Sequence, residues 1–347
     1  MRDMPATDQP LVYLHETPPE PGHSIEIAKG LIWLRLPLPF VLNHVNCWLL
    51  DDGDRWTIID TGADRPETRA IWEDVIANRL NGKPVGRLVC THGHPDHVGL
   101  AGWLCEKLDI RLHMTLSEWL APQLWREQGL KPMADEEKRN FLRNGISERG
   151  IVKMMQAREA SPFRNHPLPL SFARIRDGDV IAMGGQDDWQ VLVNGGHAEE
   201  HASFYSRTGR VLIAGDQILS RISPVVGVFT SQPWGDPLKD YLASLKRLAA
   251  LPADTLVLPS HGLPFHGLHE RIAQLETHHA KRLAELEGYM DAPKTGAALA
   301  RQLFADAVAK GQMMMAMAET VAHANYLVGR GKAKRIETKD AVTFAKV

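Results

Sequence analysis

The sequence has few cysteines. Only three occur among its 347 residues, and no two of them form a CxxC pair: Cys47, Cys90 and Cys105. An odd count with this spacing argues against a disulfide framework and against a zinc site built from thiolates. We therefore expect all three cysteines to be small buried hydrophobic residues.

The chain also lacks a surplus of charge and any candidate membrane segment. Its 42 acidic and 40 basic residues give a net charge of −2, which does not favour nucleic acid or a membrane surface as a partner. No run approaches the roughly 20 apolar residues of a membrane span. The first residues, MRDMPATDQP, carry charges and prolines where a secretory signal would be apolar. These absences predict a cytoplasmic, globular protein with no membrane partner.

Short apolar runs are present from residue 25 onwards, after a Pro-rich stretch that we interpret as a loose lead-in at 1–24. The runs are broken by Pro, Asn or the turn-like DDGD, a pattern typical of successive strands. ETRAIWEDVIANRL then places apolar residues at helical spacing, and VGRLVC follows as a buried strand. The order of strand, helix and strand predicts an α/β layered fold.

Helical stretches interrupt this strand-rich region at about 115–165. Such an insertion could form a lid or the wall of a pocket, or it could be plain scaffold. Strands return up to LIAGD, and a final strand, DTLVLPSHG, ends near residue 262. A long amphipathic helix then covers 268–290, and the tail at 293–347 contains two further helices and a hairpin with a basic first arm. We accordingly predict a catalytic domain at 25–266 and a small helical domain at 267–347.

The strongest chemical signal is THGHPDHVG at 91–99, which follows a buried strand. His92 and His94 alternate by two, so an extended loop can direct both imidazoles to one metal ion. Asp96 and His97 follow a proline that turns the chain toward a second ion. This spacing predicts two metal ions at one loop.

This segment resembles the HxHxDH signature of the metallo-β-lactamase superfamily, and the resemblance extends over residues 25 to about 265. It implies an αββα four-layer fold with a helical insertion and a small C-terminal winged-helix-like domain. It also implies that His92, His94 and His197 hold a first metal, that Asp96, His97 and His261 hold a second, and that Asp216 bridges them. Zinc suits these nitrogen and oxygen ligands best, with two ions per chain, although iron and manganese accept similar sets.

Several of these residues have a plainer interpretation when taken singly. His197 or His261 alone is more often a surface or core histidine, and Asp216 could simply begin a loop after its strand. Asp60 in IIDTG could cap a turn or, by the resemblance, brace the metal loop from outside. His201 could orient a ligand, contact substrate or lie on the surface. The remaining histidines, among them His278 and His279, are assigned no function.

The metal set predicts hydrolysis by a hydroxide shared between two ions, which lower the pKa of water and polarise the substrate. Asp96 would orient the attacking hydroxide, and the aspartate at position 216 resembles the glyoxalase-II-like, lactonase-like and phosphodiesterase branches rather than true β-lactamases. We expect an acyl substrate, namely a thioester, a lactone or another ester, with a hydrophobic portion suggested by the insertion. A homodimer is also considered, since the tail could pack on the catalytic domain or on a second subunit.

Two other activities remain to be weighed. Phosphodiester or RNA cleavage is the main alternative, because the tail carries a basic cluster at Arg330, Lys332, Lys334 and Arg335. Against it, the cluster is short and lacks interleaved aromatic residues, so we do not expect nucleic acid to be the partner. Iron-dependent oxidation is disfavoured because a dioxygenase would use one metal and leave Asp96 and His97 without a function.

Overall fold

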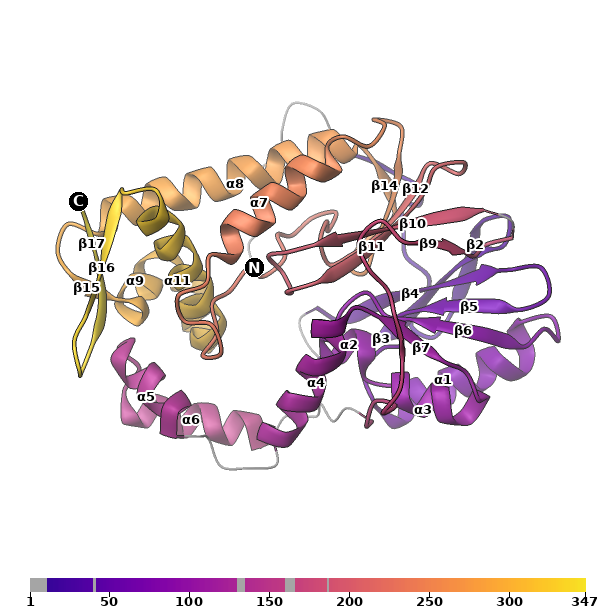
Figure 1. Cartoon of the computed structure of the whole chain (residues 1–347), viewed down its shortest axis with the longest axis horizontal. Coiled ribbons are helices and arrows are strands. Elements are labelled where there is room, and N and C mark those ends of the chain that lie inside the picture. The colour runs from indigo at the N-terminus through magenta and orange to yellow at the C-terminus, as the bar shows by residue number, and fades with distance from the viewer. Residues whose placement is uncertain (1–10, 40–41, 130–134, 160–165, 186) are drawn as a thin grey trace.

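The structure is a computed structural model that describes residues 11–347 apart from 40–41, 130–134, 160–165 and 186. Two seven-stranded sheets lie face to face, and helices cover the outer face of each (Figure 1). This arrangement confirms the predicted αββα four-layer fold. Among the described residues, no helix is long and apolar enough to cross a membrane.

The first sheet follows chain order from β2 to β8, so successive strands are neighbours. Neighbouring strands from β2 to β5 pair antiparallel, and neighbouring strands from β5 to β8 pair parallel. The strands are β2 (Ser24–Ala28), β3 (Leu31–Pro37), β4 (His44–Asp51), β5 (Trp56–Ile59), β6 (Val85–Val89), β7 (Leu112–Met114) and β8 (Ala173–Arg174). Its outer face is covered by α1 (Pro66–Asp74), the π-helical turn η1 (Val75–Arg79) and α3 (Ala101–Leu108).

The second sheet has the order β1-β14-β13-β12-β11-β10-β9. Its strands are β1 (Val12–Tyr13), β9 (Val180–Ala182), β10 (Asp188–Asn194), β11 (His201–Ser206), β12 (Val211–Gly215), β13 (Leu256–Pro259) and β14 (Phe265–His266). α7 (Pro237–Leu248) and α8 (Leu268–Tyr289) pack on its outer face. The expectation of a loose lead-in is wrong at Val12–Tyr13, because these residues pair with β14 at the sheet edge.

The core between the sheets is aromatic and aliphatic. Trp33 and Trp48 stack with ring centroids 6.1 Å apart, and they pack with Phe204 of the facing sheet. The three cysteines are buried and unpaired, as predicted. A second core lies on the outer face of the first sheet and includes Cys47, Cys90 and Cys105. These two cores fix the strands in place, and the candidate functional side chains lie at the ends of these strands.

The helical insertion and the C-terminal part share a further core. The insertion consists of α4 (Leu116–Gly129), α5 (Asp135–Arg143) and α6 (Glu148–Glu159). Phe141, Ile146 and Ile151 pack with the helices and small sheet of the C-terminal part rather than with either seven-stranded sheet. The C-terminal part comprises β15 (Lys294–Thr295), α9 (Gly296–Leu303), α10 (Ala305–Ala309), α11 (Met313–Gly329), β16 (Ala333–Glu337) and β17 (Val342–Lys346). The predicted C-terminal helices are therefore present, and β15 and α10 are additional to the predicted elements; β15, β17 and β16 form a small three-stranded sheet in that order.

Candidate metal centre

The metal loop begins where β6 ends and closes into a one-turn helix, α2 (Pro95–Val98). Pro95 fixes its own φ and favours an extended conformation in the residue before it. His94 accordingly has ψ 148° and precedes the helix as its N-cap. His92 and His94 therefore project from the loop, whereas Asp96 and His97 project from the helical turn, as the spacing predicted.

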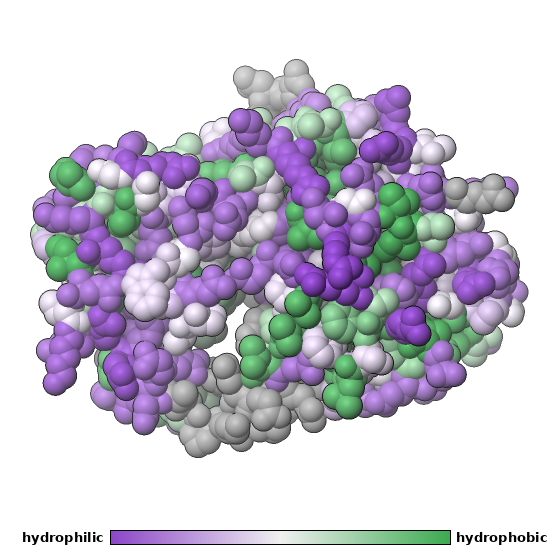
Figure 2. Space-filling view, viewed as in Figure 1, coloured by the Kyte–Doolittle hydropathy of each residue, from purple (hydrophilic) through white to green (hydrophobic). Residues whose placement is uncertain are grey.

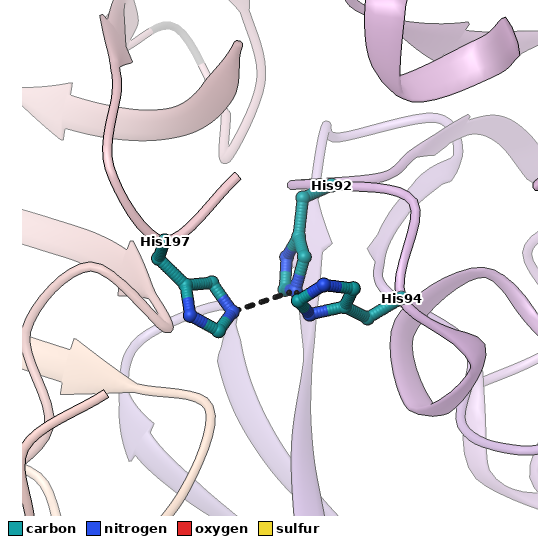
Figure 3. Close-up of side chains that lie close together, drawn as sticks. All are labelled: His92, His94 and His197. Carbon is teal, nitrogen blue, oxygen red and sulfur yellow. Dashed lines mark hydrogen bonds between the residues drawn. The ribbon is translucent and has the colours of Figure 1, made fainter. Parts of the chain in front are cut away.

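Three histidines from two loops converge on one point (Figure 3). His92 Nε2 lies 2.9 Å from His94 Nδ1 and 3.3 Å from His197 Nε2. His197 comes from the turn between β10 and β11, and its Nδ1 donates to the Val225 carbonyl oxygen at 2.8 Å. The lone pair on its Nε2 is thereby directed at His92 and His94. These three side chains form the first set of potential ligands.

A second set lies beside the first. His261 Nε2 is 3.5 Å from Asp96 Oδ2 and 3.3 Å from Asp216 Oδ1. His97 Nε2 is 3.6 Å from Asp96 Oδ2 and 3.5 Å from Asp216 Oδ1. The other oxygen of Asp216, Oδ2, faces His197 Nε2 at 3.4 Å. Asp216 therefore directs one oxygen to each set, and all seven residues named from the sequence meet at one centre.

Two buried atoms at this centre fit a cation. Neither His97 Nε2 nor Asp216 Oδ1 forms a hydrogen bond within the described part of the chain. Buried polar atoms of native proteins are nearly always paired, so an unpaired acceptor in each of two neighbouring residues points to a bound group. Imidazole nitrogen and carboxylate oxygen are also the donors that zinc takes in proteins.

The electrostatics differ between the two sets. Burial lowers the pKa of His92 and lowers that of His94 to about 3, so both imidazoles are neutral. Burial also opposes a charge on His261, but the carboxylates of Asp216 and Asp96 outweigh it and raise the pKa to about 10. Positive charge is thus favoured between these carboxylates, and a metal ion binding there would displace a proton.

Asp60 holds the metal loop from outside. Its Oδ1 accepts from Thr91 N at 2.8 Å, and its Oδ2 accepts from Thr91 Oγ1 and from His97 Nδ1, also at 2.8 Å. Its φ of 62° lies in the left-handed region, which Asp tolerates better than most residues. Thr91 Oγ1 in turn lies 3.0 Å from His92 Nδ1. Asp60 therefore orients both a first-set and a second-set histidine, as the resemblance implied.

His201 is an outer residue of the same centre. It is fully buried, which excludes the surface interpretation, and its Nε2 accepts from Asp216 N at 3.1 Å. A Cβ at Gly215 would lie 2.4 Å from that nitrogen, so only glycine fits between the imidazole and the bridging carboxylate. His201 thus positions the backbone of Asp216.

Other supporting residues had no sequence signal that we recognised. His44 on β4 accepts from Gly262 N through its Nε2, and its carbonyl oxygen accepts from His261 Nδ1 at 2.7 Å. Asn46 donates to the carbonyl oxygens of Pro259 and Gly262. Both residues fall in NHVNCWLL, where alternation on a buried strand next to the turn could have drawn attention to them.

Comparison with known proteins agrees with this geometry. The metallo-beta-lactamase superfamily description matches residues 41–261, and the description "Metallo-beta-lactamase-like, C-terminal domain" matches residues 283–347. A curated relative from Bacillus subtilis, "Probable metallo-hydrolase YqjP", is 30% identical over 315 residues, which cover 86% of this chain and 92% of the relative.

Solved structures give the same result over nearly the whole chain. A beta-lactamase domain protein from Burkholderia ambifaria is 37% identical with a TM-score of 0.85, covering 97% of each chain. The metallo-beta-lactamase family protein TTHA1429 from Thermus thermophilus is 31% identical with a TM-score of 0.78, covering 93% of this chain and all of that one. The chain is a metal-dependent hydrolase and belongs to the metallo-β-lactamase superfamily.

Proposed function

We propose that this hydrolase uses a dinuclear zinc centre to cleave an acyl substrate: a thioester, a lactone or another ester. The observation that carries the proposal is Asp216, whose two oxygens face the two ligand sets separately. His92, His94 and His197 would hold one ion, and Asp96, His97 and His261 would hold the other. Two such ions supply an ionisable water near neutral pH and polarise a carbonyl oxygen.

The protein side chains divide the remaining tasks between them. Asp96 is the most exposed member of its set, with 20% of its side chain accessible against 0% for His97 and 2% for His261. Its carboxylate is therefore the group best placed to orient a water and accept its proton. Thr91 and Asp60 hold the imidazoles of His92 and His97 in fixed orientations.

Exposed apolar side chains on the helical insertion support a hydrophobic portion of the substrate. The first turn of α4 contacts the metal loop through Glu118, and Leu120 and Leu124 of the same helix are 43% and 59% exposed. Figure 2 shows hydrophobic side chains over this helix next to a hollow that separates it from the C-terminal part. Phe229, on the segment that also carries Val225, is 45% exposed. These side chains would cover the acyl chain of the substrate. The test below varies the length of that chain.

A substrate panel tests the proposal. Zinc-loaded protein should hydrolyse acyl thioesters, lactones or aryl esters with a kcat/KM at least about 100-fold above that for β-lactams and for bis(p-nitrophenyl) phosphate, equivalent to roughly 2.7 kcal/mol of transition-state preference. Longer acyl chains should lower KM if the apolar surface is used. A preference for the phosphodiester or for a β-lactam would refute the proposal.

Nucleic-acid cleavage is the alternative, and the C-terminal part offers little surface for it. In helix-turn-helix proteins the second helix enters the DNA groove. The corresponding helix here, α11, is buried over most of its length between α7, α8 and α9. Its Ala318 carbonyl oxygen accepts from Val228 N, so α11 also packs on the catalytic domain.

The basic cluster is likewise partly engaged within the molecule. Arg335 pairs with Glu337 at 2.8 Å, and its guanidinium lies near the ring of Trp234. The guanidinium of Arg330 lies 3.7 Å from the ring centroid of Tyr326. Lys332 lies 3.7 Å from Glu287, and Lys334 is exposed. Few of these charges are left to contact phosphates.

We expect RNA to bind no more tightly than the non-specific range, roughly 10⁻⁴ to 10⁻⁶ M at physiological salt. The measurement is a titration of labelled single-stranded RNA at several salt concentrations, for the native chain and for a variant with Gln at positions 330, 332, 334 and 335. Ester hydrolysis should hardly differ between the two. Sub-micromolar, salt-sensitive binding that the Gln variant loses would favour the nuclease.

A further inference from the structure

The helical insertion begins with a buried carboxylate that contacts both ligand loops. Glu118, in the first turn of α4, is 2% exposed. Its Oε2 accepts from Gly93 N at 2.8 Å, and its Oε1 accepts from Glu200 N at 3.0 Å. Gly93 lies between His92 and His94 in the chain, and Glu200 follows His197 by three residues. One side chain therefore joins the two loops that supply the three-histidine set.

The contact with the metal loop is close enough to require glycine. A Cβ at Gly93 would lie 2.7 Å from the Glu118 carbonyl oxygen and 2.9 Å from Pro122 Cγ. The loop backbone thus rests directly on the first turn of α4, and a shift of this turn would move His92 and His94. The other loop is fastened to the same turn, since Ser117 N and Oγ donate to Glu200 Oε2 and Thr115 Oγ1 donates to the Glu200 carbonyl oxygen.

The three-histidine set needs such a joint because its members are far apart in sequence. His92 and His94 follow β6 of the first sheet, whereas His197 follows β10 of the second. A metal ion demands that these nitrogens keep their positions to within a few tenths of an ångström. Hydrogen bonds from backbone N–H groups to a carboxylate are shorter and stronger than neutral ones, so Glu118 can fix the distance between the loops.

We propose that Glu118 is a positioning residue for the three-histidine metal site, through which the helical insertion holds the His92 and His94 loop against the His197 loop. This inference rests on the metal centre proposed above. Glu118 contacts backbone amides, not the ligating side chains, so its effect is on the geometry of the site. The Asp96, His97 and His261 set should be affected much less, because Asp60 holds His97 and the His44 carbonyl oxygen holds His261.

Metal affinity measured by competition with a chromophoric chelator tests this assignment. Glu118→Gln keeps the size of the side chain but turns an amide N–H₂ toward one of the two backbone donors. One of its two zinc-binding steps should weaken about 10- to 100-fold, the range found when groups that orient metal ligands are removed. The other step should stay near the native value. Gln123→Ala lies on the same helix, where the Gln123 amide donates to the Trp119 carbonyl oxygen, and this control variant should bind both ions as the native chain does.

The same measurement in the Asp96→Ala chain identifies which site is weakened. Asp96→Ala should leave only the three-histidine site competent, and adding Glu118→Gln should weaken its single zinc ion by the same factor. Glu118→Asp keeps the charge but shortens the side chain by one methylene, and it should give an intermediate loss if the Gln variant does not fold. Circular dichroism and thermal unfolding of the metal-free variants establish that each is folded.

Native-like binding of both ions by Glu118→Gln, or by Glu118→Asp if only that variant folds, would overturn the assignment. So would an equal loss at both sites accompanied by a lower unfolding temperature, because that pattern belongs to general destabilisation. Failure of the proposed centre would look different: the native chain itself would then bind fewer than two zinc ions.

Discussion

Replacing Asp96 by alanine is expected to lower kcat/KM for the preferred ester by about 10²- to 10⁴-fold, the usual contribution of a positioned acid or base. The substitution also removes a ligand from the second set, whose His97 and His261 lie 3.6 and 3.5 Å from the Asp96 carboxylate. The side chain is partly exposed on a one-turn helix, so the fold should persist. Steady-state kinetics of the zinc-loaded variant, with circular dichroism, provide the measurement.

His201→Ala is the matched comparison for Asp96→Ala. His201 binds the backbone of Asp216 and not the substrate side of the centre, so its loss should reduce kcat/KM by only about 10-fold, the lower part of the range for groups that orient ligands. Equal losses in the two variants would show that His201 acts directly in catalysis, contrary to the outer position assigned to it here.

Removing the metal ions should cause the largest change in stability. Ions that bind only the folded chain stabilise it by about 4 kcal/mol per site when free metal is 1,000 times Kd. For two sites in a chain of this size, the unfolding temperature should rise by about 10 °C or more on zinc addition. Calorimetry of chelator-treated protein, before and after titration with zinc, measures this rise.

The Asp96→Ala chain serves as the control for this effect. It retains the three-histidine set, so zinc should still stabilise it, by about half the native increment. An equal increment in the two proteins would mean that the second set contributes no binding energy. If zinc left the unfolding temperature of the native chain unchanged, that result would contradict metal binding at either set.

The ligand positions could be predicted because each follows a strand end with a short, distinctive pattern. THGHPDH follows β6, Asp216 follows β12, and His261 follows β13. Parallel pairing of β12 and β13 brings the last two residues to one edge of the sheet. A local motif combined with strand order was therefore sufficient to bring these residues together.

The supporting residues could not be predicted in the same way because their functions depend on non-local contacts. Glu118 begins an ordinary helix, and nothing in its neighbourhood shows that it will meet Gly93 and Glu200. Arg271 reads as one basic residue of an amphipathic helix, yet it is buried and donates to the carbonyl oxygens of Leu219 and Ile222, just after Asp216. Such residues are identified by what they contact.

The packing partners of the helical insertion could not be predicted from the sequence either. The sequence predicted helical stretches at about 115–165, where Phe141 and Ile151 lie, but a helical pattern does not say which surface an apolar face will meet. In the structure they pack with the C-terminal helices, and Ala297 N donates to the Asn144 carbonyl oxygen at 2.9 Å. The two-residue strand β1 was missed for another reason, since so short a segment has no pattern to read.

The number of metal ions bound per chain tests the two-metal centre most directly. Elemental analysis or native mass spectrometry of zinc-reconstituted protein should give close to two ions, because His92, His94 and His197 form one set and Asp96, His97 and His261 form another around Asp216. Parallel samples loaded with iron or manganese show which metal binds most tightly. A value that stays near one after zinc reconstitution would contradict the dinuclear centre and restore a mononuclear, dioxygenase-type chemistry.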